Sequence, residues 1–297
     1  MSRTESVARS TFVAIAAVGL TACADLQLFI ANVAVASGAF KETRDVPYGN
    51  ERGQELDIYR PRRTVPGTPA GPLPVIVFFH GGAWSVDSKD QYKFVGVALA
   101  EQGWLSVVPN YRQYPQVRFP VFVEDAALAI AWVRNNAASY GGDPAKIILV
   151  GHSSGAHIAM LAALDKRYLA AHGMNADEIR GVIGLSGPYD FLPFPSSNLH
   201  EVFAGGADPL DTQPIHFARA DAPPVLLLHG SADTVVTANN SVNLAAALER
   251  LGARVELKIY EGRDHADLAA AFSRLKRDPP PVLEDVGAFI RTRTAGN

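Results

Sequence analysis

The sequence predicts an α/β fold with a mostly parallel central sheet that helices flank on both faces. Short runs of consecutive apolar β-formers recur along the chain, as at residues 75–79 and 147–150, without the alternation of a half-exposed strand. Segments with helical patterns separate these runs, and both of the runs named here lead into glycine-rich turns. Alternation of buried strands and helices is typical of a doubly wound sheet.

The composition of the chain by itself excludes several classes of function. The chain has 297 residues, of which 48% are hydrophobic, so a single large α/β domain accounts for it. With a net charge of −3 and no long basic run, the sequence lacks the basic region that is typical of proteins that bind nucleic acid. The single cysteine, Cys23, rules out an internal disulfide, and no His/Cys cluster has zinc-site spacing. We therefore expect no metal and no organic cofactor.

The N-terminus has the order of charge and hydrophobicity that is typical of a secretory signal. Two arginines lie among residues 1–10, and a short apolar run follows at residues 11–20. The next residues, Leu-Thr-Ala-Cys, resemble the lipobox of bacterial lipoproteins. We therefore predict that residues 1–23 are a signal peptide, that Cys23 is lipidated, and that the exported protein is anchored to a bacterial membrane on its periplasmic or cell-surface side. An uncleaved membrane anchor over residues 11–40 and a plain cleaved signal remain alternatives.

Residues 24–50 are predicted to be a linker or an amphipathic helix that precedes a catalytic domain at residues 51–297. The helix would lie on the membrane or pack on the domain, because five apolar residues recur at near-helical spacing. They are Leu26, Phe29, Ile30, Val33 and Phe40.

Within the catalytic domain the expected elements alternate until one irregular segment interrupts them. Between Tyr189 and Ala222, phenylalanines are interspersed with prolines and polar residues. This segment is too short for a second domain, so we expect an insert that covers the site beyond the carboxyl ends of the strands. The expected strands are at residues 55–59, 75–79, 104–108, 147–150, 181–185, 224–230 and 254–260, and helices are expected at 90–103, from Pro120 onward, at 156–164 and at 238–251.

A nucleophile motif lies between a buried strand and a strong helix former. Residues 151–155 read Gly-His-Ser-Ser-Gly and fit the Gly-x-Ser-x-Gly elbow, in which glycines relieve crowding and the central serine is held on a strained turn. The start of the following helix favours negative charge. We therefore predict Ser153 as the nucleophile, with an ordinary Gly/Ser turn as the alternative.

A second strand leads into a loop of small residues that suits oxyanion binding. Residues 80–84 read His-Gly-Gly-Ala-Trp, and only small residues bring backbone N–H donors close to a developing oxyanion. We predict that the backbone N–H groups of Gly82, Ala83 and Ser154 form this oxyanion hole. A plain glycine turn after the strand is the alternative reading.

The base and its orienting carboxylate are predicted from chain order. A serine nucleophile needs a histidine to take its proton and a carboxylate to fix the tautomer of that histidine. In this architecture the order is Ser, then Asp or Glu, then His. Asp233 lies in the turn after strand 224–230, and His265, one of eight histidines, lies in the loop after strand 254–260. We therefore predict a triad of Ser153, Asp233 and His265.

Other roles for the acid and the base stay open at this point. Asp233 could instead cap the helix that follows it. Asp264 and Asp267 are nearer to His265 in sequence, although sequence neighbours rarely face the far ring nitrogen. The histidine could also be an isolated surface residue.

The substrate pocket is predicted only in outline. Phe191 and Phe194 of the insert either contact substrate or pack the insert itself. Trp84 either forms the floor of the pocket or packs in the core. His152 is expected to point away from the serine hydroxyl and is interpreted, like His157, as structural, while its place beside the nucleophile keeps it among the candidate substrate-binding residues.

With these residues assembled, residues 55–290 resemble the α/β-hydrolase superfamily, and within it bacterial carboxylesterases with a His-Gly-Gly-x-Trp loop. Residues 110–112 (Asn-Tyr-Arg), 140–144 (Tyr-Gly-Gly-Asp-Pro) and 151–157 are similar to the branch that holds feruloyl-esterase-like enzymes and isoprenylcysteine methylesterases. The loop also resembles that of kynurenine formamidases. Ala83 departs from the third glycine of the hormone-sensitive-lipase pattern, which weakens any transfer of that group's preferences.

The sequence therefore predicts a serine carboxylesterase that hydrolyses small esters through an acyl-enzyme on Ser153. An amidase or arylformamidase with the same triad is the nearest alternative. A serine peptidase is disfavoured because no gating domain is expected, and a non-catalytic lipoprotein is the non-enzyme alternative. The sequence makes no prediction about oligomeric state.

Overall fold

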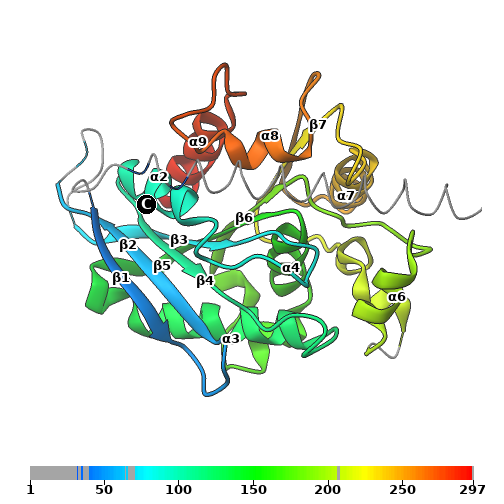
Figure 1. The fold of residues 1–297 in the computed structure, drawn as a ribbon, viewed down its shortest axis with the longest axis horizontal. Coiled ribbons are helices and arrows are strands. Elements are labelled where there is room, and N and C mark those ends of the chain that lie inside the picture. Colours follow the sequence, from blue (N-terminus) through cyan, green and yellow to red (C-terminus); the bar gives the residue numbers. More distant parts are fainter. Residues whose placement is uncertain are drawn as a thin grey trace, which may run out of the picture.

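The computed structural model describes residues 32, 35, 40–63, 65, 71–205 and 208–295. In this part of the chain eight strands form one sheet in the order β1-β2-β4-β3-β5-β6-β7-β8 (Figure 1). The predicted signal peptide and Cys23 lie outside the described residues. The strands are β1 (Phe40–Pro47), β2 (Glu55–Pro61), β3 (Leu73–Phe79), β4 (Leu105–Pro109), β5 (Gly142–His152), β6 (Ile179–Leu185), β7 (Val225–Gly230) and β8 (Val255–Tyr260).

Pairing within the sheet confirms the predicted, mostly parallel architecture. Strands β3 to β8 pair in parallel with their neighbours, whereas β1 with β2 and β2 with β4 are antiparallel. The loops after β3, β5, β7 and β8 therefore leave the sheet at the same edge, where open α/β sheets bind their ligands.

Helices cover both faces because successive strand residues point to opposite sides. Val75 and Val77 of β3 pack on one face, and Ile76 and Phe78 pack on the other. The first face carries α3 (Val121–Asn136), α4 (Ser154–Leu164), α5 (Lys166–Ala170) and α7 (Asn239–Arg250), and the second carries α2 (Lys93–Glu101), α8 (His265–Ala270) and α9 (Val282–Thr294), as Figure 1 shows for α3 against α8 and α9.

The sheet begins earlier than the sequence predicts. Part of segment 24–50, predicted as a linker or amphipathic helix, is strand β1, which pairs with β2 from Phe40 to Pro47. The prediction is wrong for this part because β1 is an edge strand with a single buried residue, Phe40, so its sequence lacks an apolar alternation. The folded domain therefore includes residues that precede residue 51.

Asn32 shows that the chain before β1 also contacts the domain. Its side-chain amide donates to the backbone carbonyls of Asp90 and Gln91 at 2.8 and 3.0 Å, and its carbonyl accepts from the N–H of Phe94 at 2.9 Å. Because the N-cap residue of α2, Tyr92, makes no capping side-chain hydrogen bond, Asn32 satisfies this helix start from a distant part of the sequence.

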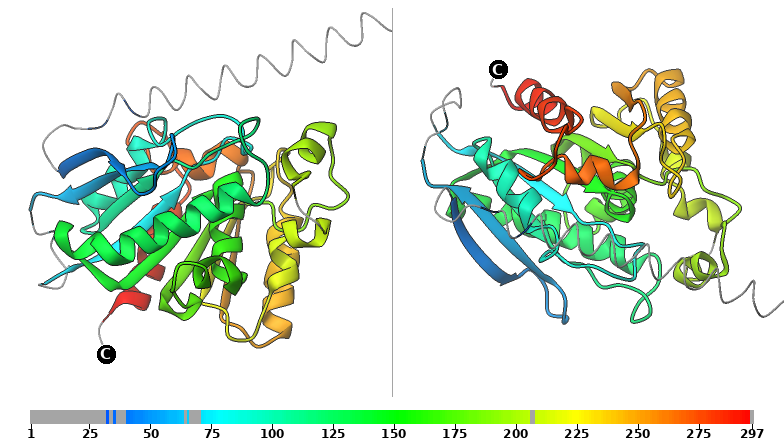
Figure 2. Two further views of the ribbon diagram at one scale, coloured as in Figure 1. Left: turned by 90° about the horizontal axis from the view of Figure 1, so that it is seen from below. Right: turned by 45° about the horizontal axis from the view of Figure 1, so that its top comes forward.

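The irregular insert lies at the end of the molecule remote from β1 (Figure 2). It contains α6 (Ser197–Phe203) and the short 3₁₀ helices η3 (Pro209–Thr212) and η4 (Pro214–Phe217). Two more 3₁₀ helices, η1 (Ala137–Tyr140) and η2 (Ala176–Glu178), precede β5 and β6. Among the described residues, no helix combines the length and the apolar character needed to cross a bilayer.

Candidate active site

The predicted nucleophile occupies a sharp turn between β5 and α4. Ser153 has φ 54° and ψ −122°, a backbone conformation that L-residues rarely adopt. A Cβ added to Gly155 would lie 2.1 Å from the carbonyl oxygen of Phe79, and one added to Gly151 would lie 2.3 Å from the carbonyl oxygen of Gly155. Both glycines of the motif are therefore required by close backbone packing, which explains the strained elbow.

The structure brings the three predicted triad side chains into one hydrogen-bonded chain. Nε2 of His265 lies 2.9 Å from Oγ of Ser153, and Nδ1 lies 2.8 Å from Oδ2 of Asp233. Because an ionised carboxylate only accepts, Nδ1 carries the proton and Nε2 is left to accept the serine proton. The geometry is that of a nucleophile, a general base and an orienting carboxylate.

Asp233 is held as a buried anion. Its Oδ1 accepts from the backbone N–H groups of Val235 and Val236 at 2.9 and 2.8 Å, while Oδ2 contacts His265 and His229. Burial by itself would raise the pKa of this carboxyl, but the contacts with His229 and His265 outweigh burial and hold the pKa well below its usual range. Asp233 therefore stays ionised and keeps His265 in the required tautomer.

The alternative roles considered for these residues do not match the geometry. Helix α7 has Ala238 as its N-cap and no side-chain cap, so Asp233 does not cap it. Asp264 accepts from the N–H of Asp267 at 2.9 Å and forms the capping box of α8 with it. His265 is hydrogen-bonded at both ring nitrogens and is not an isolated surface residue.

The predicted oxyanion loop has an unusual backbone beside the nucleophile. Gly82, Ala83 and Trp84 have φ values of 115°, 49° and 57°. A Cβ added to Gly81 would lie 3.3 Å from Cβ of Ser153, so the loop passes directly beside the serine. Among the hydrogen bonds of the described residues, none uses the backbone N–H of Gly82, Ala83 or Ser154. These donors remain available for an oxyanion, as the predicted role requires.

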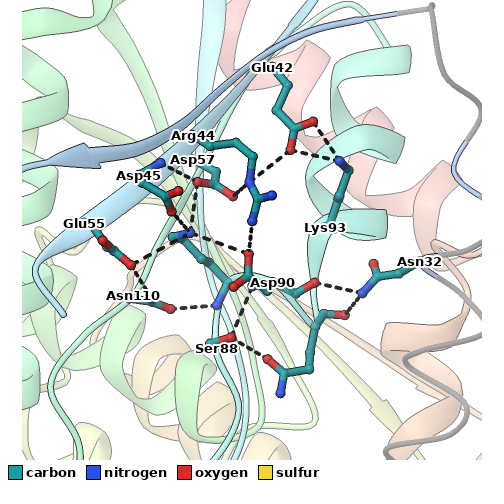
Figure 3. A network of polar contacts seen from close by, with 12 residues as sticks. Asn32, Glu42, Arg44, Asp45, Glu55, Asp57, Ser88, Asp90, Lys93 and Asn110 are labelled. Atoms are coloured by element: carbon teal, nitrogen blue, oxygen red, sulfur yellow. Dashed lines mark hydrogen bonds and ion pairs between the residues drawn. The ribbon is translucent and has the colours of Figure 1, made fainter.

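An ion network around the buried side chains of Lys89 and Asp57 fixes the chain that follows this loop (Figure 3). Nζ of Lys89, whose side chain is 1% exposed, lies 3.1 Å from Oδ1 of the equally buried Asp57 and 2.5 Å from Oδ1 of Asp45. The backbone N–H of Lys89 donates to the side chain of Asn110 at 2.7 Å. The loop between the predicted oxyanion residues and α2 is thereby tied to β1, β2 and the end of β4.

Trp84 lies in a buried aromatic cluster. It is 4% exposed, its indole N–H donates to Nδ1 of His157 at 3.2 Å, and its ring stacks with Phe191 at 6.1 Å between centroids. Phe194 stacks on Phe203 at 5.3 Å, and Phe203 contacts Trp84 at 4.9 Å. The insert is therefore joined to the oxyanion loop through aromatic rings, and Phe191 and Phe194 are half-buried in this contact.

His152 lies behind the triad. It is 5% exposed, and its Nε2 lies 3.1 Å from the backbone carbonyl oxygen of His265 while Nδ1 lies 3.3 Å from the hydroxyl of Tyr92. As the sequence predicts, it makes no contact with the serine hydroxyl. Its contacts assign it to the support of His265.

His229 is a site residue that sequence reasoning missed. It is the last residue but one of β7, is fully buried, and contacts Asp233. The run His-Gly-Ser-Ala-Asp at residues 229–233 carried the signal, because a histidine followed four residues later by a carboxylate in a tight turn can face it. Only the acid of this run was predicted.

Known proteins are similar to this chain in sequence and in fold. A sequence model of the BD-FAE family matches residues 56–248, which include Ser153 and Asp233. Isoprenylcysteine alpha-carbonyl methylesterase ICME of Arabidopsis thaliana is 32% identical over 250 residues, covering 76% of this chain and 56% of that protein. Esterase LipQ of Mycobacterium tuberculosis is 34% identical over 271 residues, covering 84% and 62%. The chain thus spans little more than half the length of these relatives.

A solved structure agrees with these similarities. Esterase 2 of Thermogutta terrifontis superposes with a TM-score of 0.71 and 26% sequence identity, covering 87% of this chain and 96% of that one. The α/β-hydrolase architecture predicted from the elbow and the oxyanion loop is therefore confirmed. With the family model matching well over half of its sequence, the chain belongs to the BD-FAE family.

Proposed function

We propose that this protein is a serine carboxylesterase that hydrolyses small carboxylic esters through an acyl-enzyme on Ser153. The observation that carries the proposal is the chain of hydrogen bonds from Asp233 through His265 to Ser153, at 2.8 and 2.9 Å. The relatives with esterase names support it. All the groups needed for acyl transfer are side chains or backbone of this one domain.

Acylation follows from the positions of these atoms. Oγ of Ser153 attacks the ester carbonyl carbon as its proton passes to Nε2 of His265, and the π electrons move to the carbonyl oxygen. The backbone N–H groups of Gly82, Ala83 and Ser154 stabilise that oxyanion. The intermediate then collapses, the bond to the alcohol oxygen breaks, and the alcohol leaves with the proton from Nε2.

Deacylation repeats these steps with water. A water molecule gives a proton to Nε2 of His265 and attacks the acyl carbon, which returns the negative charge to the oxyanion hole. When this second intermediate collapses, Oγ of Ser153 leaves and regains the proton from Nε2. The products are a carboxylic acid and the free serine, so the enzyme is restored without a redox change.

We propose short acyl groups as substrates. Esterase 2 of Thermogutta terrifontis has been solved with propionate and with butyrate bound, at 26% sequence identity to this chain in each case. In this chain Trp84 is already packed against His157 and Phe203, which leaves its ring committed to the aromatic cluster. An acyl chain long enough to extend into this cluster would have to displace these contacts.

A series of p-nitrophenyl esters from acetate to decanoate, with methyl ferulate added, tests activity and acyl length together. We expect hydrolysis that is fastest for short acyl chains. Ser153→Ala should lose both turnover and reaction with a fluorophosphonate probe. An inert wild-type protein, or equal probe labelling of Ser153→Ala, would contradict the proposal, and a preference for decanoate would contradict the acyl-length part alone.

The same machinery could in principle cleave a formamide, so an N-formyl aniline belongs in the assay. A resonance-stabilised amide is a poorer electrophile, and its amine leaving group must be protonated as the bond breaks. We therefore expect kcat/KM to be higher for p-nitrophenyl acetate than for the formanilide by several orders of magnitude. Comparable values would favour an arylformamidase instead.

We also propose that the protein is exported and anchored through a lipid on Cys23. The sequence supports this through the short apolar run and the lipobox-like residues before the cysteine. Growth of a bacterial expression host with a clickable fatty acid tests the proposal. Label is expected on the wild-type protein and not on Cys23→Ser. An unlabelled wild type, or undiminished label on Cys23→Ser, would contradict it.

A further inference from the structure

His229 belongs to a buried polar chain that continues behind the triad. Its Nδ1 lies 2.8 Å from Oγ of Ser241, and its Nε2 lies 2.8 Å from the carbonyl oxygen of Val236 and 3.2 Å from Oδ2 of Asp233. His229 and Ser241 are both fully buried. Buried polar groups that are mutually satisfied in this way hold one arrangement.

The neighbours of the ring fix the position of its proton. Both atoms near Nε2, the carbonyl oxygen of Val236 and the carboxylate of Asp233, can only accept. Nε2 therefore carries a hydrogen, and in the neutral ring Nδ1 accepts from the hydroxyl of Ser241. This N–H donates to the carbonyl oxygen of Val236, and Nε2 lies 3.2 Å from Oδ2 of Asp233, the carboxylate oxygen that accepts from His265.

We propose that His229 is a positioning residue for the reaction, which sets the basicity of His265 because its N–H dipole lies beside Oδ2 of Asp233. The proposal rests on the proposed function, because it assigns His265 as the base. The N–H dipole of His229 disperses the negative charge on Oδ2. His265 therefore meets a weaker acceptor than an unshared carboxylate would provide, and its protonated form is less stabilised.

The direction in which removal of this N–H shifts the pH dependence of the reaction can be predicted. Oδ1 of Asp233 stays held by the N–H groups of Val235 and Val236, so the carboxylate keeps its place. Its undispersed charge then binds the imidazolium form of His265 more tightly, and a higher pH is needed to free the base. The acidic limb of the pH–rate profile should therefore move to higher pH.

The other titratable groups around the base differ from His229 in their contacts. The ring of His152 packs 5.0 Å from that of His265, and Tyr92 contacts His152 from α2's side. Burial, followed by the nearby His265, lowers the pKa of His152 to about 3, so it does not titrate in the range assayed. A shift of the acidic limb of the pH–rate profile in a His229 variant would therefore reflect a changed interaction between Asp233 and His265.

Two isosteric variants separate a tuning role from a structural one. The amide nitrogen of Gln reaches the place of Nε2, so His229→Gln keeps a donor toward Asp233 and Val236. The amide of Asn reaches only the place of Nδ1, so His229→Asn keeps the contact with Ser241 and loses the donor toward Asp233. Both substitutions bury one neutral amide at the same site, so we expect them to lower the free energy of unfolding by similar amounts.

The rate of Ser153 labelling by a fluorophosphonate, measured from pH 5 to pH 9, gives a readout that needs no ester turnover. For His229→Asn we expect the midpoint of the acidic limb to rise by about 0.5 to 1 pH unit. At pH values below the midpoint, the labelling rate should be about three- to tenfold lower than that of the wild type. At pH 9 the two rates should agree within about twofold. His229→Gln should keep the wild-type midpoint.

Ser241→Ala provides an independent test should His229→Asn fold poorly. It removes the hydroxyl that holds Nδ1 of His229, so the ring can turn and carry its N–H away from Oδ2 of Asp233. The midpoint should then rise in the same direction by a smaller amount. Unshifted midpoints in His229→Asn and Ser241→Ala, equal shifts in the Asn and Gln variants, or a loss that is uniform over pH would overturn the inference. An unlabelled wild type would instead overturn the proposed function, and this inference with it.

Discussion

His152 donates from Nε2 to the backbone carbonyl of His265 at 3.1 Å, so the residue next to Ser153 in sequence holds the backbone of His265. The carbonyl oxygen can only accept, which leaves Nδ1 of His152 to accept from the hydroxyl of Tyr92 at 3.3 Å. Nucleophile, base and α2 are thus joined by one neutral histidine. The last residue of β5 and the first residue of α8 are held together in this way.

The first prediction concerns this support. His152→Phe keeps an aromatic ring beside His265 and removes the donor, which leaves the carbonyl of His265 without that partner. We expect kcat to fall about tenfold, from a loss of about 1.4 kcal/mol in the alignment of the base, with little change in KM. His152→Gln, which retains a donor at the place of Nε2, should recover most of the rate. Equal kcat for the Phe and Gln variants would contradict this role.

The second prediction concerns the oxyanion loop. In Gly82→Ala the new Cβ would meet the carbonyl oxygen of Val86 at 2.0 Å, and the residue would keep a φ of 115°, which L-residues avoid. The loop has to shift, and its donors move off the oxyanion. We expect kcat for a p-nitrophenyl ester to fall about 10²- to 10³-fold, as for the loss of one oxyanion donor.

Ala83→Gly is the matched control in the same loop. Ala83 already has a φ of 49°, so glycine removes backbone strain of about 1 kcal/mol, which the larger entropy of the unfolded chain offsets. The free energy of unfolding and kcat should both stay near the wild-type values. A large loss of kcat in this variant would mean that the side chain of Ala83 itself contacts the substrate.

The third prediction is loss of stability in mild acid. Burial lowers the pKa of His80 and His157 from 6.5 to about 4, against weaker opposing hydrogen bonds to the backbone at Gly81 and Thr212, and it lowers that of His152 to about 3. Between these values and 6.5 the unfolded chain binds more protons than the folded one, so stability rises with pH there. The free energy of unfolding should therefore fall steadily as pH drops from 6.5 toward 4, by about 3 kcal/mol for each histidine.

Urea unfolding at a series of pH values between 7.5 and 4.5 measures this slope. His157→Gln removes one of the three titrating groups while an amide can still donate to the carbonyl of Thr212, the present partner of Nε2. The variant should lose less stability over the same pH interval than the wild type does. A free energy of unfolding that is flat from pH 6.5 to 4.5 would show that these histidines are protonated without cost.

The triad could be predicted because each of its members follows a strand that the sequence marks clearly. The runs predicted at residues 147–150, 224–230 and 254–260 correspond to the parallel strands β5, β7 and β8. The carboxyl ends of these strands meet at one edge, so chain order alone brings Ser153, Asp233 and His265 together. The glycines at 151 and 155 mark the tight turn by their lack of side chains. Local pattern and global topology agree here.

The parts that sequence reasoning missed depend on contacts between distant residues with no local pattern. β1 is an edge strand with polar faces, and Asn32 caps a helix that starts about sixty residues later. His229 gained its role only through the turn that brings Asp233 back to it. A single histidine, asparagine or lysine forms no repeating pattern in the sequence, so its contact partner can be identified only in the folded structure.

The last prediction tests the ion network that follows the oxyanion loop. Lys89 and Asp57 are each 1% exposed, and Nζ of Lys89 lies 3.1 Å from Oδ1 of Asp57. Lys89→Met fills a similar volume but leaves the buried carboxylate without its cation, with Arg44 as its next cationic neighbour at 3.7 Å. We expect the free energy of unfolding to fall by about 3 kcal/mol, because the buried charge of Asp57 loses its nearest cation and keeps only the more distant and half-exposed Arg44. Adding Asp57→Asn removes that charge, and the amide can keep the hydrogen bond that the backbone N–H of Asp45 donates at 2.9 Å. The double variant should therefore recover at least half of the loss. A single variant that loses less than about 1 kcal/mol, or a double variant no more stable than the single one, would show that the network does not depend on this buried pair.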